Sequence, residues 1–365
     1  MGANEQAGVA ASAAVAALAK ANARLADGKT PLVKNCWYIA GWGSDFTREP
    51  RERTLLGQSL VFYRTQGGQP VALLNRCPHR SFPLSQGKLE GDVLRCGYHG
   101  LAFRQDGSCA EIPSQTSVPP STCTRSYPVA ERGPFVWIWM DDAARADESA
   151  IPDTSWLVDP KWNYVTSYLS LQANYVYLQE NLLDLSHFTY LHPSTLGTPE
   201  YARSPFEVST TENTVHISRF VAECDVPPIY ARTGIAGKMS RRTESEFVSP
   251  AMHHASAVLS DLQPEPGKRR DFTVYITHFA TPETQDSTHY WFSFARDFAL
   301  GETEVDEYMR QSAITAFNED KGALEAIARI YRTEPEATGA EIHIKSDQAG
   351  VAMRRILLRM ANEQV

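Results

Sequence analysis

The sequence predicts an α+β protein in which a small β domain precedes a larger domain built from an antiparallel β-sheet surrounded by helices. Residues 31–142 carry short segments rich in β-branched and aromatic residues, separated by glycine-containing turns, as is typical of a β domain. Residues 271–298 carry two longer segments of this kind, and residues 304–332 repeat apolar residues at helical spacing. Strands and helices are therefore expected together in the second part of the chain.

The individual elements follow from local composition. The segments SLVFYRT (59–65) and FVWIWMDD (135–142) are expected to be strands of the first domain. DFTVYITHFAT (271–281) and THYWFSFARDF (288–298) are expected to form two long strands joined at the turn-forming segment PETQDS. The segment LQANYVYLQENLLDLSHFTYLH (171–192) is interpreted as one helix.

The length of 365 residues suits about two domains. We expect an alanine-rich extension over residues 1–30, a first domain over 31–150 and a second domain over 151–365. The polar segment AARADESAIPD (143–153) is the expected linker.

Composition and charge exclude several classes of function. Asp and Glu total 43 against 35 Lys and Arg, so the net charge is −8 and the chain is poorly suited to bind nucleic acid or an anionic membrane. No apolar run approaches the roughly 20 residues of a membrane-spanning helix. The six cysteines lack the paired spacing of a disulfide framework, which predicts free thiols and a cytoplasmic location.

Four potential metal ligands lie in the first domain: Cys77, His79, Cys96 and His99. A structural zinc site is the main alternative, but zinc ligands usually pair cysteine with cysteine and histidine with histidine. Here each half of the motif carries one of each, which suits a cluster whose thiolates hold one iron and whose imidazoles hold the other. The pattern predicts a Rieske 2Fe-2S cluster, with the two halves on loops that leave neighbouring strands.

A second motif, NLLDLSHFTYLHP, carries His187 and His192. Because Pro193 disfavours a helical conformation at the preceding residue, His192 is expected just past a helix end, turned back toward His187. Two imidazoles and one carboxylate make the facial triad of non-heme iron(II) oxygenases, whereas the alternative is a helix end with surface histidines. The long helix offers three carboxylates among which periodicity does not choose: Glu319, Asp320 and Glu325.

The two motifs together resemble those of the Rieske non-heme iron oxygenases. Cys77-Pro-His79 and Cys96-Gly-Tyr-His99, separated by sixteen residues, match the cluster motif of that family, and NLLDLSHFTYLH matches its iron motif. The resemblance spans about residues 35–357. The segments GYHGLAFRQDGSCAEIPSQ and FNEDKGALEAI look like those of the vanillate O-demethylase and dicamba monooxygenase branch.

This resemblance implies a set of site residues. Asp320 would join His187 and His192 as the third ligand of a mononuclear Fe(II). Asn181 would lie near the open face of the iron, its alternative being a plain helix-face amide. His278 would lie in the substrate pocket, its alternative being a strand histidine hydrogen bonded to backbone.

The resemblance also implies an assembly. In a head-to-tail homotrimer, the cluster of one subunit would face the mononuclear iron of the next. The carboxylate of Asp184 would contact both His187 of its own subunit and His99 of the partner subunit, and so orient both rings. Because the chain has no dinucleotide or flavin motif, electrons would come from NAD(P)H through a separate reductase or ferredoxin.

The implied function is that of the oxygenase component of a multicomponent monooxygenase, which uses O2 at the mononuclear iron to hydroxylate an aromatic substrate. The expected reaction is oxidative O-demethylation of a methoxy-aromatic acid with release of formaldehyde. Ring hydroxylation, N-dealkylation or methyl hydroxylation of another aromatic compound is the alternative, and a non-catalytic Rieske electron carrier is a remote one. Arg241, Arg242 and the run Lys268–Arg270 can be considered for a substrate carboxylate, although such charges usually lie in solvated loops.

Overall fold

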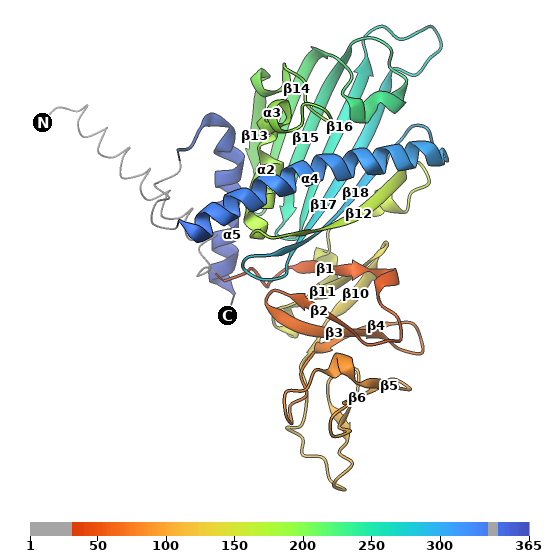
Figure 1. Ribbon diagram of the computed structural model, residues 1–365, viewed down its shortest axis with the longest axis vertical. Coiled ribbons are helices and arrows are strands. Elements are labelled where there is room, and N and C mark those ends of the chain that lie inside the picture. The colour runs from red at the N-terminus through yellow and green to blue at the C-terminus, as the bar shows by residue number, and fades with distance from the viewer. Residues whose placement is uncertain (1–30, 335–341, 365) are drawn as a thin grey trace, which may run out of the picture.

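The computed structural model describes residues 31–334 and 342–364 (Figure 1). The expected alanine-rich extension over residues 1–30 lies outside the described residues. Figure 1 shows an elongated molecule, with small sheets at one end and a large sheet crossed by a long helix at the other. In the described ranges, no helix is both long and apolar enough to cross a bilayer.

Three small antiparallel sheets make up the N-terminal part. The first has the order β1 (Trp37–Trp42), β11 (Phe135–Trp139) and β10 (Val129–Arg132). The second has the order β2 (Arg51–Leu55), β3 (Gln58–Arg64), β4 (Pro70–Leu74) and β9 (Ser126–Tyr127). The third, which forms the far tip of the molecule, has the order β5 (Lys88–Glu90), β6 (Val93–Arg95), β7 (Ala102–Phe103) and β8 (Cys109–Glu111).

The C-terminal part is built on one antiparallel sheet with the order β12-β18-β17-β16-β15-β14-β13. Its strands, in chain order, are β12 (Asn163–Leu171), β13 (Phe206–Thr210), β14 (Val215–Cys224), β15 (Met239–Ser249), β16 (Met252–Asp261), β17 (Asp271–Pro282) and β18 (Thr288–Arg296). The α+β class expected from the sequence is therefore confirmed, with the β sheets of the first part preceding a sheet covered by helices.

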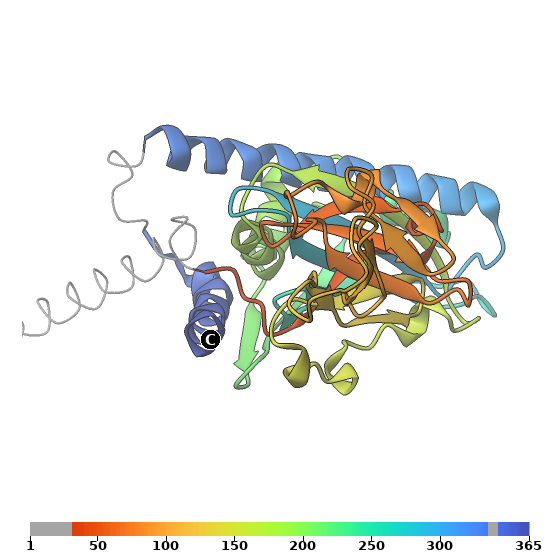
Figure 2. The same cartoon turned by 90° about the horizontal axis from the view of Figure 1, so that it is seen from below.

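Helices cover one face of this large sheet. α2 (Tyr175–Leu183) contacts β15 and β17, and α4 (Thr303–Thr333) contacts β12 and β18. α5 (Gln348–Glu363) packs against α2 and β14, and Figure 2 shows α4 running along the sheet for almost its whole width. The buried residues of α4 repeat every three or four positions: Val305, Met309, Ala313, Ala316, Phe317, Asp320, Leu324 and Ala328.

The two parts of the molecule are joined by hydrogen bonds and by a shared apolar cluster. The Thr281 hydroxyl donates to the Ile39 carbonyl at 2.9 Å, and the Leu56 amide donates to the Pro282 carbonyl at 2.7 Å. Ile39 and Phe279 are both fully buried in one cluster that spans the junction. The β17 end of the large sheet thus fixes the first strand of the N-terminal part.

The single helix expected over residues 171–192 is wrong. β12 runs to Leu171, α2 ends at Leu183, and a 3₁₀ turn over Leu185–His187 leads into the short helix α3 (Phe188–Leu191). The break is at Asp184, whose carboxylate accepts the Ser186 amide at 2.9 Å and so caps a new turn in place of continuing the helix.

Candidate active site

Three side chains converge where α4 crosses the chain that follows α2. His187 ends the 3₁₀ turn, His192 follows α3, and Asp320 lies on the buried face of α4. One ligand atom from each lies within 4.8 Å of the other two. The Asp320 Oδ1 atom is 3.1 Å from Nε2 of His192 and 3.4 Å from Nε2 of His187. Among the three carboxylates that the sequence left open, Asp320 is the one that joins both histidines.

The turn after α3 aims His192 at this point. His192 leaves the helical conformation, with φ −114° and ψ 42°, as expected for a residue that precedes proline. Its carbonyl accepts the Gly197 amide at 2.8 Å, which closes the turn. A Cβ atom at Gly197 would lie 2.0 Å from the Phe188 carbonyl oxygen, so only glycine allows the chain to return this closely.

The outward nitrogen of each histidine has its own acceptor. Nδ1 of His187 lies 2.5 Å from the backbone carbonyl of Asp184, and Nδ1 of His192 lies 2.6 Å from Oε2 of Glu319. Donation through Nδ1 leaves both Nε2 atoms facing Asp320 as lone-pair donors, which is the arrangement of metal-bound histidines. Nε2 of His187 is buried and has no hydrogen-bond partner, as expected of an atom that binds a metal.

Charge at this point also suits a divalent cation. Burial alone would raise the pKa of Asp320, but the neighbouring His187 and His192 outweigh it and hold the pKa well below its usual range. Burial alone would lower the pKa of His192, but Asp320 and Glu319 outweigh it and raise the pKa. Two imidazoles and one ionised carboxylate are the donor set of the facial triad, so these residues fit a mononuclear Fe(II).

Asp184 differs from its expected role within the subunit. Its carboxylate caps the 3₁₀ turn, and the group that contacts His187 is its backbone carbonyl. The reason is local: the carboxylate of a residue at a turn start is held by the amide two residues later. The contact with His99 of the partner subunit remains a prediction.

Asn181 and His278 both lie beside the triad. The Asn181 amide donates to Oδ1 of Asp320 at 2.9 Å, so this side chain is more than a plain helix-face amide. Nδ1 of His278 lies 2.7 Å from the Tyr290 hydroxyl, and therefore a side chain rather than backbone holds this ring. Burial lowers the pKa of His278 to about 3, so the ring is neutral at pH 7.

A cavity adjoins the triad between the large sheet and helices α2 and α4. His187, Asp320, Asn181 and His278 line it. Most of the remaining wall is apolar: Leu182, Leu185, Phe188, Ile276, Phe294 and Phe317. A mainly apolar wall with a few polar groups is typical of small-molecule sites.

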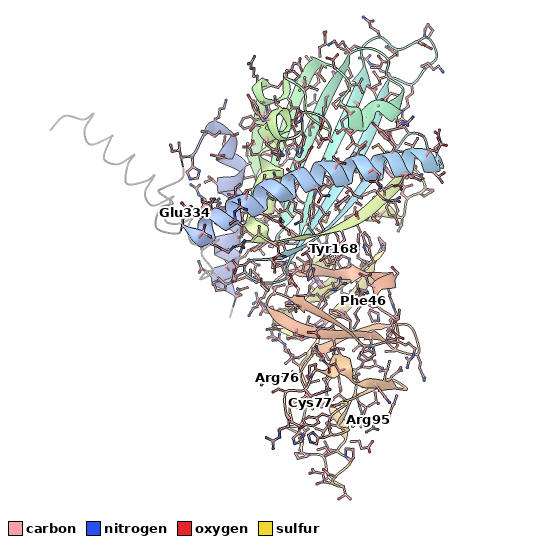
Figure 3. The ribbon with its side chains drawn as sticks, in the orientation of Figure 1. Phe46, Arg76, Cys77, Arg95, Tyr168 and Glu334 are labelled. Atoms are coloured by element: carbon pink, nitrogen blue, oxygen red, sulfur yellow. The ribbon has the colours of Figure 1, made fainter. Side chains whose placement is uncertain are left out.

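The second group of predicted ligands lies at the opposite end of the molecule. Cys77 and Cys96 are 2% and 3% exposed, whereas His79 and His99 are exposed, with ring centroids 4.5 Å apart. Figure 3 places Cys77 near the tip, remote from the large sheet. Buried thiols beside paired outer imidazoles fit a cluster with one iron inside and one iron near the surface.

The loops that carry these ligands correct one expectation. Cys77 follows β4 and Cys96 follows β6, and these strands belong to two different sheets rather than being neighbours. Each loop closes by a backbone bond, from the Ser81 amide to the Cys77 carbonyl at 2.9 Å and from the Gly100 amide to the Cys96 carbonyl at 3.2 Å. Burial raises the pKa of the Cys77 thiol to about 11, so binding of a metal has to supply the charge that stabilises the thiolate.

Comparison with known protein families agrees with both sites. The Rieske 2Fe-2S domain matches residues 36–128, and the vanillate O-demethylase oxygenase C-terminal domain matches residues 171–363. Together the two matches define a Rieske-type oxygenase, which is an oxidoreductase with a 2Fe-2S cluster and non-heme iron. This chain belongs to the Rieske oxygenases whose catalytic domain is of the vanillate O-demethylase type.

Three curated relatives are similar over most of their length. The iron-sulfur subunit of the toluene-4-sulfonate monooxygenase system of Comamonas testosteroni is 40% identical, over 84% of this chain and 90% of the relative. The dicamba O-demethylase oxygenase component of Stenotrophomonas maltophilia is 34% identical, over 89% and 96%. The vanillate O-demethylase oxygenase subunit of a Pseudomonas species is 31% identical, over 91% and 96%.

A solved structure shows the same fold. Dicamba monooxygenase bound to 3,6-dichlorosalicylic acid matches with a TM-score of 0.84 and 32% identity, over 91% of this chain and 98% of that chain. This chain is thus an oxygenase component, as the resemblance implied.

Two contacts of the site differ from what the sequence alone indicates. Glu319 was considered as an iron ligand, but it holds the outer nitrogen of His192. For Arg241 the sequence leaves a substrate carboxylate and a solvated loop as alternatives, and the structure places this residue on β15, with 1% of its surface exposed, in the cavity wall. In both cases, the position of the residue in a helix or strand indicates whether its side chain faces the site.

Proposed function

We propose that this oxygenase hydroxylates an aromatic acid, and that its reaction is the oxidative O-demethylation of a methoxy-aromatic acid with release of formaldehyde. The observation that carries the proposal is the largely apolar cavity that reaches from the His187–Asp320 pair to a buried cation, Arg241. The names of the relatives agree with it, because vanillate and toluene-4-sulfonate are both aromatic anions.

The residues have distinct roles in this proposal. Cys77, His79, Cys96 and His99 hold a 2Fe-2S cluster, and His187, His192 and Asp320 hold Fe(II). The iron, when bound, supplies the chemistry of dioxygen activation. Apolar side chains exclude water from the cavity, and the neutral ring of His278 can exchange a hydrogen bond with the substrate without adding charge. Asn181 restrains the Asp320 carboxylate through its amide.

We further propose a head-to-tail homotrimer. The cluster ligands lie at the tip of the molecule, away from the large sheet of the same chain (Figures 1 and 3). The exposed His99 and Tyr98, whose rings are 3.9 Å apart, offer a contact surface for a partner subunit. In that arrangement Asp184 would contact the partner subunit's cluster. The cluster would receive its electrons from a separate NAD(P)H-dependent reductase or ferredoxin.

We also propose a cytoplasmic location and a domain boundary near residue 150. All six cysteines are free, and five of them are buried, which favours a reducing compartment. Short 3₁₀ turns at Ala143–Arg145 and Glu148–Ala150 occupy the expected linker between β11 and β12.

Methyl hydroxylation is the second candidate, favoured by the 40% identity to the toluene-4-sulfonate monooxygenase subunit. The test is product analysis with reductase, NADH and O2. The probes 4-methoxybenzoate and toluene-4-sulfonate separate the two reactions, because the first yields formaldehyde and the second yields the benzylic alcohol. Product from 4-methoxybenzoate supports the proposal. Turnover restricted to toluene-4-sulfonate would replace it with methyl hydroxylation, and a protein inactive on both acids despite full iron and sulfide would contradict both reactions.

A further inference from the structure

A buried guanidinium that has no counterion among the described residues lies in the wall of the cavity. Arg241, on β15, has 1% of its surface exposed. It donates from Nη1 to the Leu196 carbonyl at 2.9 Å and from Nη2 to the Tyr230 hydroxyl at 3.3 Å, while its Nε is buried without a partner. Within the described ranges, no carboxylate lies within 4.0 Å of this guanidinium.

Such an arrangement is unfavourable unless something supplies negative charge. Arginine stays protonated in proteins, so burial cannot be relieved by loss of a proton. The rings of Phe188, Tyr201 and Tyr230 lie 4.9 to 5.4 Å from the guanidinium carbon and stabilise the cation in part. None of these rings, and neither of the two hydrogen-bond acceptors, carries a formal charge.

Other buried arginines show what is missing. Arg296, with 1% of its side chain exposed, has the Asp306 carboxylate at 2.5 Å. Arg219, 3% exposed on β14, donates to the Tyr201 and Ser204 carbonyls and faces the same Tyr201 ring, so it adds a second positive charge near Arg241. This region of the sheet therefore holds two buried guanidinium groups, and among the described residues neither has a carboxylate within salt-bridge distance.

The cavity connects this cation with the iron site. Asp320, the carboxylate in the wall, is held by the two histidines, and His278 is neutral. The lining between the two ends is mainly apolar, with Phe188 and Phe317 among its members. A ligand that fits has one anionic group and a flat apolar body.

We propose that Arg241 binds the acid group of the substrate, the carboxylate or sulfonate of an aromatic acid, and so presents the opposite end of the ring to the iron site. This assignment rests on the proposed function and adds the residue that selects anions. The planar guanidinium has five N–H donors, of which two serve the protein, and can bind either acid through two parallel hydrogen bonds. Arg241 is a positioning and specificity residue and takes no part in the oxygen chemistry.

The test compares binding of acids with binding of their neutral isosteres by the iron-loaded protein. Calorimetric titration would use 4-methoxybenzoate against 4-methoxybenzamide, and toluene-4-sulfonate against toluene-4-sulfonamide. We expect the wild type to prefer at least one acid over its amide by about tenfold or more, as a charge-assisted pair provides. The acid that is preferred more strongly over its amide shows whether the natural substrate carries a carboxylate or a sulfonate.

Variants at Arg241 then show whether this residue causes the preference. Arg241→Gln should remove it, weakening acid binding by about tenfold or more while the amides change by less than about threefold. Arg241→Lys keeps the positive charge but lacks the paired donors of the guanidinium, so it should retain part of the preference for acids. This variant is a second test in case the glutamine variant does not fold. Arg242→Gln, the same change at the exposed neighbouring position, should match the wild type.

Three outcomes would overturn the assignment. Either the wild type binds amides as tightly as acids, or binds neither, or else Arg241→Gln weakens acids and amides by one common factor, as a purely structural role for Leu196 and Tyr230 contacts would. The proposed reaction is tested separately. If acids bind through Arg241 but no product forms, the anion site stands and the proposed reaction is rejected.

Discussion

The two proposed metal sites of this chain are built in opposite ways. The cluster ligands come from two short loops at the tip of the molecule, and His79 and His99 are exposed. The iron ligands come from a turn and a long helix, and His192 and Asp320 are 0% and 5% exposed. The exposed imidazoles suit exchange of electrons with another protein, whereas the enclosed triad suits selection of a small molecule.

The difference also concerns how each site is supported. Each cluster loop is closed by its own backbone hydrogen bonds, so its ligands are placed locally. The triad needs α4 to lie on the sheet, because Asp320 and Glu319 come from that helix. Changes in α4 should therefore affect one site and leave the other unchanged.

The largest expected effect is that of Asp320→Ala. Loss of the carboxylate leaves two imidazoles, so turnover should fall to background and iron should drop by about one per chain. The visible spectrum of the cluster should stay unchanged. Metal analysis and absorption spectra measure this, with Glu307→Ala, at an exposed position of the same helix, as the control. A simultaneous loss of the cluster spectrum would show that the two sites are not independent.

A smaller loss is expected from Glu319→Gln. The glutamine no longer accepts the Nδ1 proton of His192 as a charged partner, so iron affinity or activity should fall by about 10- to 100-fold. Competition with a chelator measures the affinity. Glu325→Gln is the matched control, since Glu325 contacts Lys321 and the Gln172 amide instead of a histidine. Equal iron affinity of both variants would argue against the role given to Glu319.

Gly197→Ala should break the triad by backbone displacement. The new Cβ would lie 2.0 Å from the Phe188 carbonyl, so His192 must shift and unfolding should become easier by about 2 kcal/mol. Gly322→Ala, in α4 with open space around it, should instead stabilise by up to about 1 kcal/mol. Urea unfolding and iron content measure both, and an unchanged Gly197→Ala protein would show that the turn is pliable.

The smallest effect concerns acid stability of the large sheet. Burial lowers the pKa of His254, on β16, to about 4, so the unfolded chain binds a proton more readily than the folded one below the ordinary pKa of 6.5. Stability due to this residue is complete above pH 6.5 and is lost as the pH falls toward 4. His254→Phe should therefore gain about 1 to 2 kcal/mol relative to wild type between pH 7 and pH 5.

Urea midpoints at both values of pH measure this gain. His216→Phe is the control, because 34% of its side chain is exposed. An identical pH dependence in the His254 variant and the wild type would show that another group controls acid stability.

Sequence reasoning found local features and missed those that depend on burial. The cluster motif and the His187–His192 pair each lie within a short segment, so their spacing was readable. Asp320 was readable too, in retrospect, because it occupies the apolar stripe of α4 between Phe317 and Leu324, whereas Glu319 lies beside that stripe. A carboxylate on the buried face of a helix is therefore a stronger indication of a metal ligand than helical periodicity alone.

Arg241 and the break at Asp184 were harder for physical reasons. On β15 alternate residues face inward, but the inward set includes Arg241, Thr243 and Ser245. In the sequence, these polar residues look like those of a strand face exposed to solvent. In the sequence, an aspartate that caps a new turn cannot be distinguished from one inside a helix. Only its backbone geometry distinguishes the two. The domain boundary near residue 150 stays a prediction.

The split origin of the triad has a consequence for how the protein is made. All four cluster ligands lie between residues 77 and 99, whereas Asp320 follows more than 200 positions later. A ribosome therefore releases the complete cluster motif long before α4 exists. Until that helix is synthesised and docks, a nascent chain offers iron only two histidines. If these residues hold the two centres as proposed, the cluster can be installed before α4 is made, whereas the mononuclear iron site is complete only after α4 has docked.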